Sequence, residues 1–167
     1  MLNQKYIKNR NIILEENYIP ISILKNLKKK LKFPIPHYNE LIQFLSKLFK
    51  HFNVNFIALY GSVVRKTYSY RSDLDIFIIA SDFPNNIFER LDRLYSFFIP
   101  NIDFKAHTLE EFYIMIKNWH LTILEVCYDH CFIYDPMNIG KKMYKDFKKL
   151  YNAGKIIRGK NYWIKNL

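Results

Sequence analysis

The sequence of 167 residues has little of what defines several classes of protein. Its two cysteines, Cys127 and Cys131, are too few for a secreted domain held together by disulfides. No apolar run approaches the ~18 residues that a membrane-spanning helix needs, and the polar residues 1–10 lack the apolar centre of a signal peptide. Four glycines and six prolines exclude collagen-like repeats. We therefore expect a cytoplasmic globular protein of ordinary domain size.

Positive charge dominates the sequence but is unevenly spread. There are 26 Lys and Arg residues against 15 Asp and Glu, which gives a net charge of +11. Residues 1–50 carry 10 basic and 3 acidic side chains, residues 51–136 carry 7 and 11, and residues 137–167 carry 9 and 1. The acidic middle predicts carboxylates that share a role, and the basic ends predict a polyanion nearby.

The apolar pattern predicts strands alternating with helices. Short apolar runs bounded by turn residues predict strands at 54–60, 74–80, 102–107 and 131–134. Apolar residues at helical spacing predict helices at 21–32, 38–51, 84–98 (opened by Pro84), 109–130 (interrupted near Asn118) and 137–153. Thr108 and Glu111 have the spacing of a capping box. We divide the chain into a basic helical extension (1–36), a central domain (37–154) and a basic aromatic tail (155–167).

Gly61 and Ser62 follow the first predicted strand, where a short helix is expected to begin. Glycine permits close approach of the backbone, and the free N–H groups at the start of a helix can bind a phosphate. A Gly-Ser pair after a strand is also a common turn, so this pattern alone does not choose between the two interpretations.

Three aspartates form the candidate catalytic group. Asp73 and Asp75 are two positions apart at the start of the second predicted strand, so their side chains point to the same face, roughly 7 Å apart along the backbone. Asp103 lies between apolar neighbours in the third strand. If these strands are adjacent, the three carboxylates can hold two divalent cations, and hard oxygen ligands favour Mg²⁺ or Mn²⁺. The alternative is that they are separate surface residues.

In combination these features resemble the DNA polymerase β-like nucleotidyltransferase superfamily, and in particular the minimal nucleotidyltransferases of bacteria and archaea. The resemblance rests on a Gly-Ser pair, an Asp-x-Asp pair ten residues later and an apolar-flanked aspartate on a later strand. It covers about residues 40–136. The matching residues are Gly61, Ser62, Arg65, Ser72, Asp73, Asp75 and Asp103. Lys66 stands where such families often have glycine, which leaves the substrate open.

The resemblance implies an α+β fold in which helices flank a mixed sheet. It also implies a reaction in which a nucleoside monophosphate, by default AMP from ATP, is transferred to a protein or RNA acceptor and pyrophosphate is released. The implied catalytic residues and ligands of two Mg²⁺ ions are Asp73, Asp75 and Asp103. The implied nucleotide-binding residues are Gly61, Ser62, Arg65, Lys66 and Ser72.

Other interpretations remain open. Small members of this family are often antitoxins that pair with a HEPN-type RNase toxin, and in a pure binding role the site would be vestigial. A basic RNA-binding protein is supported by charge alone. The tail, which includes Tyr162 and Trp163, suits either base stacking on RNA or docking on the core. His107 is a candidate neighbour of the site, and the cysteine spacing favours buried thiols over a zinc site.

Overall fold

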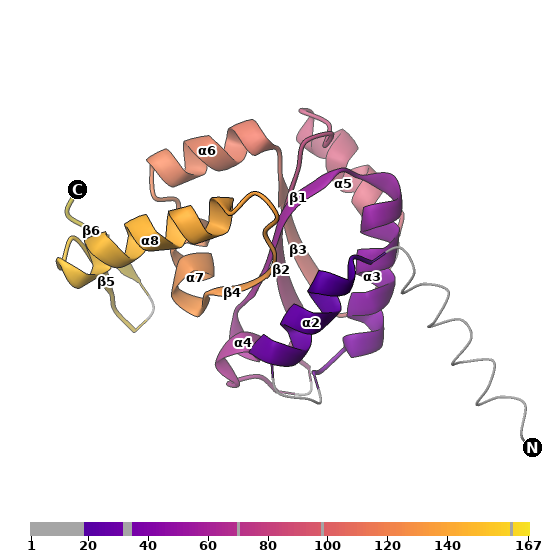
Figure 1. Cartoon of the computed structure of the whole chain (residues 1–167), viewed down its shortest axis with the longest axis horizontal. Coiled ribbons are helices and arrows are strands. Elements are labelled where there is room, and N and C mark those ends of the chain that lie inside the picture. The colour runs from indigo at the N-terminus through magenta and orange to yellow at the C-terminus, as the bar shows by residue number, and fades with distance from the viewer. Residues whose placement is uncertain (1–18, 32–34, 70, 98, 161) are drawn as a thin grey trace, which may run out of the picture.

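A mixed sheet forms the centre of the molecule (Figure 1). The structure is a computed structural model that describes residues 19–31, 35–69, 71–97, 99–160 and 162–167. Its four-stranded sheet has the order β3-β2-β1-β4. β1 (Val54–Tyr60) is antiparallel to β2 (Leu74–Ala80) and to β4 (Cys131–Tyr134), whereas β2 and β3 (Ile102–His107) are parallel. The predicted α+β class is confirmed, and these strand bounds agree with the prediction.

Helices cover both faces of the sheet, which explains why β1 and β2 are apolar throughout. On one face, Ile57, Leu59, Ile76 and Ile78 form a core under α2 (Ile21–Lys30), α3 (Tyr38–His51) and α5 (Ile87–Tyr95). On the other face, a second core lies under α6 (Leu109–Lys117), α7 (Leu121–Asp129) and α8 (Ile139–Asn152). Figure 1 shows these two helical layers on opposite sides of the strands.

Helix ends follow local capping chemistry. As predicted, Thr108 and Glu111 form a capping box at the start of α6, and the helical segment is interrupted around Asn118. The start of α5 differs from the prediction, because it lies at Ile87 rather than at Pro84. The Asn86 side chain accepts hydrogen bonds from two amides there, at 2.9 and 3.3 Å, and so caps the helix three residues into the predicted segment. The bounds of α8 are likewise slightly inside the predicted range 137–153.

The two ends of the described chain pack on the core in different ways. α2 is amphipathic and lies against β4, where Asn26 Nδ2 donates to the Ile133 carbonyl at 2.9 Å. The rest of the predicted helical extension, residues 1–18, lies outside the described residues. The tail forms a hairpin of β5 (Ile156–Arg158) and β6 (Trp163–Lys165), which Figure 1 shows beyond α8. Ile156 is fully buried and Trp163 is half-buried, so the tail is docked.

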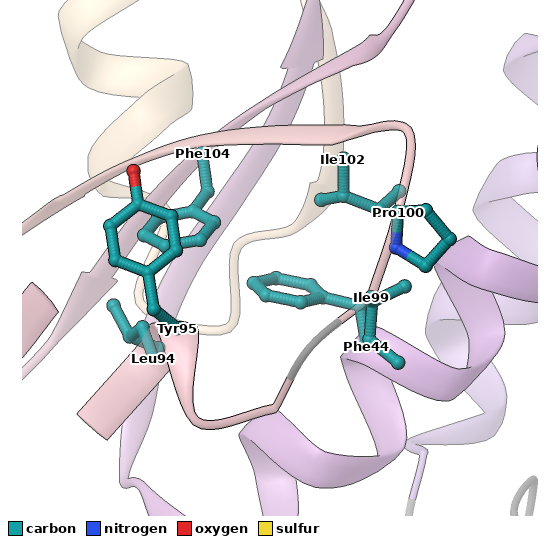
Figure 2. Close-up of a pocket in the computed structure, with 7 residues that line it drawn as sticks. All are labelled: Phe44, Leu94, Tyr95, Ile99, Pro100, Ile102 and Phe104. Atoms are coloured by element: carbon teal, nitrogen blue, oxygen red, sulfur yellow. The ribbon is translucent and has the colours of Figure 1, made fainter. Parts of the chain in front are cut away.

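An apolar pocket of about 240 Å³ lies between α3, α5 and β3. Figure 2 shows Phe44, from α3, with Tyr95 and Phe104 among the side chains that line the pocket, and the rings of Phe44 and Phe104 are stacked. Phe104 pairs in register with Ile76, so this pocket is on the α3 face of the sheet. Within the described ranges, no helix is both long and apolar enough to cross a membrane.

Candidate active site

The pairing of β2 with β3 brings two of the three predicted carboxylates together. Asp75 of β2 is the register partner of Tyr60 on β1 and of Asp103 on β3. Register partners point to the same face of a sheet, so the strand pairing places Asp75 and Asp103 side by side. The expectation that their two strands are adjacent is confirmed. Asp73 directly precedes β2 and is exposed.

The environment of Asp75 disfavours its charged form. Burial, followed by the charge of Asp103, raises the pKa of Asp75 to about 6, and Lys105 and Arg65 oppose the increase. Phe77, two positions further along β2, belongs to the core under α6, α7 and α8. Asp75 therefore faces the same helical layer from the end of the strand, partly shielded from water.

Tyr60 was missed in the sequence analysis. Its side chain is 7% exposed, and its hydroxyl has no hydrogen-bond partner among the described residues. Burial, followed by the charges of Asp75 and Asp103, raises the pKa of Tyr60 above its ordinary value. The hydroxyl is thus a neutral donor beside the carboxylate pair. An aromatic residue at the end of an apolar strand gives no sequence signal for this role.

Gly61 is required by the shape of the turn after β1. Its φ is 81°, a conformation that side chains disfavour, and a Cβ added there would overlap the Asp75 carboxylate. The single-turn helix α4 (Ser62–Arg65) follows directly. The amides of Ser62 and Val63 lie in its first turn, where no earlier helical residue can accept their hydrogen bonds. The predicted short helix after the strand is therefore present.

Two carboxylates of α7 hold this turn, and neither was predicted. Asp129 Oδ2 accepts a hydrogen bond from the Gly61 amide at 2.6 Å and pairs with Arg65 Nη1 at 2.8 Å. Glu125 Oε2 lies 3.4 Å from the same Arg65 nitrogen. The sequence did contain a signal, because Glu125 and Asp129 are four positions apart in a largely apolar helix and so share one helical face.

The remaining predicted residues lie around the site. Ser72 Oγ accepts from the Ser69 amide at 2.9 Å, within the loop that leads to β2. Lys66 is exposed and has a φ of 59° at the end of α4. His107 pairs with Glu111 at the far end of β3 rather than with Asp103. Cys127 and Cys131 are free, buried thiols, as expected.

The family comparison matches the segment that carries these aspartates. Residues 39–119 match the family model described as "Polymerase beta, Nucleotidyltransferase". This segment is a polymerase β-like nucleotidyltransferase domain. It runs from α3 to just beyond α6, so it includes Gly61 and the carboxylate pair. α7 and the C-terminal hairpin lie beyond the matched residues of the nucleotidyltransferase domain.

Solved structures show weaker similarity to the chain. A candidate nucleotidyltransferase from Sulfolobus solfataricus is 21% identical over 56% of this chain and 79% of its own, with a TM-score of 0.37. A toxin–antitoxin structure with AMP-PNP is 16% identical over 80% and 87% of the two chains, with a TM-score of 0.39. A mutant toxin–antitoxin MntA-HpeT is 16% identical over 80% and 86%, with a TM-score of 0.40. These scores add no weight to the family match. No curated protein matches the sequence.

The side chains at this site are of the kind that binds divalent cations, although no complete group of ligands is already assembled among the described residues. In the part of the chain that the structure describes, no three His, Cys, Asp or Glu side chains lie close enough together to hold an ion. Asp75 and Asp103 nevertheless supply oxygen ligands from register partners, and the charge of Asp103 raises the pKa of Asp75. A divalent cation would relieve this repulsion, and carboxylates are the ligands that Mg²⁺ prefers.

Proposed function

We propose that the chain is a Mg²⁺-dependent nucleotidyltransferase that transfers AMP from ATP to a protein or RNA acceptor and releases pyrophosphate. The observation that carries the proposal is the register pairing of Asp75 with Asp103 next to the Gly61 turn, inside the matched domain. The general reaction class follows from the family, and ATP follows from the resemblance.

Asp73, Asp75 and Asp103 would hold the divalent cations in this proposal. When bound, such ions neutralise charge on the leaving pyrophosphate and favour deprotonation of the acceptor hydroxyl. Asp75 and Asp103 are register partners at one end of the β2–β3 pairing, so the sheet fixes their separation without help from a loop. Ser62 and the first amides of α4 would contact the triphosphate, since no earlier helical residue accepts the hydrogen bonds of these amides.

Arg65 has a different role from the predicted one in this proposal. Its guanidinium is already paired with Asp129 and lies near Glu125, so it would hold the turn rather than bind a phosphate. Lys66 and Ser72 lie near the two ends of the loop between α4 and β2, where Lys66 is exposed and Ser72 is half-buried. They would add at most outer contacts with the nucleotide. The phosphate contacts would therefore come mainly from the backbone and from Ser62.

The acceptor in this proposal is a macromolecule. The basic segments on both sides of the acidic middle suit an RNA acceptor, and the resemblance suits a protein acceptor such as a HEPN-type toxin partner. The docked hairpin favours a protein acceptor over RNA. Its Arg158 and Lys165 already bond with groups of this same chain, so they are less available to bind RNA phosphates.

The test is incubation of the protein with each labelled nucleoside triphosphate, Mg²⁺ and cell extract, followed by separation of protein from RNA. Label from ATP on a protein band is the expected result. Asp75→Asn should abolish transfer while the protein stays folded, and Asp92→Asn, an exposed carboxylate on α5, is the matched control. Wild-type protein that transfers no label from any nucleotide would contradict the proposal.

Nucleotide binding provides a second test that needs no acceptor. ATP with Mg²⁺ should raise the melting temperature of the wild-type protein, because a ligand that binds only the folded state stabilises it. The same ATP in EDTA should raise it much less. Equal stabilisation with and without the metal would rule out cation-dependent binding at the aspartates.

A further inference from the structure

The C-terminal hairpin is bonded to one carboxylate of α7. Trp163 Nε1 donates to Glu125 Oε1 at 2.8 Å, and Arg158 Nη1 lies 2.9 Å from Glu125 Oε2. The Arg158 guanidinium also stacks over the Tyr128 ring, 4.2 Å from its centroid. Ile156 of β5 is also fully buried, so the hairpin is fixed at both of its strands.

The Glu125 carboxylate also contacts the nucleotidyltransferase domain. Glu125 Oε2 lies 3.4 Å from Arg65 Nη1, which is bonded to Asp129, and Asp129 accepts from the Gly61 amide. The Asp129 side chain is only 1% exposed, so water competes little for its bonds. A continuous set of polar contacts therefore joins the hairpin to the turn after β1.

The Gly61–Arg65 turn has little intrinsic stability. α4 has four residues, and no side chain caps its first turn. A helix this short is unstable alone, so its orientation depends on the groups that grip its ends. At the start of α4, Asp129 accepts a hydrogen bond from the Gly61 amide. At its last residue, Arg65 donates to Asp129 and Glu125.

We propose that Glu125 is a positioning residue of the nucleotide site, which links the C-terminal hairpin to Arg65 and so fixes the orientation of the Gly61–Arg65 turn. The inference rests on the proposed function, because it assumes that this turn binds the nucleotide. It assigns a role in the site to residues outside the matched family segment. Glu125 receives three donors from two separate parts of the chain, and the loss of any one of them would loosen the turn.

The experiment compares wild-type protein with Glu125→Gln and Trp163→Phe. Glu125→Gln keeps the shape of the side chain and removes its charge, whereas Trp163→Phe removes only the indole N–H. We expect the Kd for Mg²⁺–ATP, measured by calorimetry, to rise about tenfold for Glu125→Gln, which weakens every bond to this side chain, and about threefold for Trp163→Phe, which removes one of them. Glu89→Gln is the matched control, because Glu89 pairs with Arg93 on α5, away from the site. The Kd of this variant for Mg²⁺–ATP should equal that of the wild type.

The NMR signal of the Gly61 amide, read without nucleotide, separates positioning from general stability. It should shift, and its hydrogen exchange should quicken, in Glu125→Gln and Trp163→Phe but not in Glu89→Gln. Unchanged Kd and an unchanged Gly61 signal, even with a lower melting temperature, would overturn the inference. If Glu125→Gln does not fold, Trp163→Phe decides alone, because its ring can still pack on Tyr128 and Phe147. Wild-type protein that binds no Mg²⁺–ATP overturns the proposed function instead.

Discussion

Asp75 of β2 and Asp103 of β3 are register partners on parallel strands, and the pKa of Asp75 is raised to about 6. Burial is the largest cause, and the negative charge of Asp103 adds to it. Two carboxylates in such a position cost stability unless a cation compensates them. The repulsion between these carboxylates is therefore uncompensated before a ligand binds, and the stability of the protein should depend on pH.

The stability contributed by Asp75 should fall as pH rises. The folded state holds the Asp75 proton up to about pH 6, whereas the ordinary carboxyl pKa is 3.8, so between these values the folded state binds more protons than the unfolded state. The contribution is complete below about pH 4 and is lost as pH passes 6. Melting temperatures in EDTA should thus favour Asp75→Asn over wild type increasingly from about pH 4 to about pH 6, with the difference levelling off above that. A pH-independent difference between the two proteins would contradict the raised pKa.

Gly61→Ala should damage both the fold and the site. The backbone conformation alone costs about 1–3 kcal/mol for a side chain, and the added Cβ would also displace the Asp75 carboxylate. Gly154→Ala is a matched control, because Gly154 has a φ of 68° but no atom within 4 Å of the added Cβ. Urea unfolding should show a larger loss for Gly61→Ala, and only this variant should lose Mg²⁺–ATP binding. Equal losses would mean that the contact with Asp75 is unimportant.

Tyr60→Phe should leave the stability of the free protein unchanged or raise it by up to about 1 kcal/mol. The hydroxyl is buried without a partner among the described residues, so its removal relieves an unsatisfied group. Thr108→Val is the comparison, since its hydroxyl caps α6 and its loss should cost about 1 kcal/mol. Chemical denaturation measures both. A loss for Tyr60→Phe as large as that for Thr108→Val would show that the hydroxyl is bonded.

Ile156→Ala should test whether the hairpin is docked in solution. Ile156 is fully buried, so the truncation should lower the free energy of unfolding by about 2–5 kcal/mol. Ile157→Ala changes the next residue of the same strand, which is 42% exposed, and should have an effect within about 0.5 kcal/mol. Denaturant curves of the two variants that overlap would show that the tail does not pack on the core.

Local sequence patterns were sufficient for the strands, and they placed Asp75 and Asp103 within them. The capping chemistry of Thr108 with Glu111 acts within one helical turn. That Asp73 and Asp75 share one face stays a prediction, because Asp73 precedes β2. The start of α5 was misplaced because a proline can begin a helix, but Asn86 further along satisfies the free amides better. Each correct prediction depended on residues only a few positions apart.

Tertiary structure alone decided which groups surround the aspartates. The sequence by itself determined that Asp75 and Asp103 lie on strands, but only the parallel pairing of β2 with β3 made them register partners. The bond between the Gly61 amide and Asp129 joins residues 68 positions apart, and the bond from Trp163 to Glu125 spans 38. Periodicity carries information over the length of one element, whereas these contacts arise when separate elements pack. The sequence therefore determined the chemistry of the carboxylates, and the packing of α7 and the hairpin decided how the turn beside them is held.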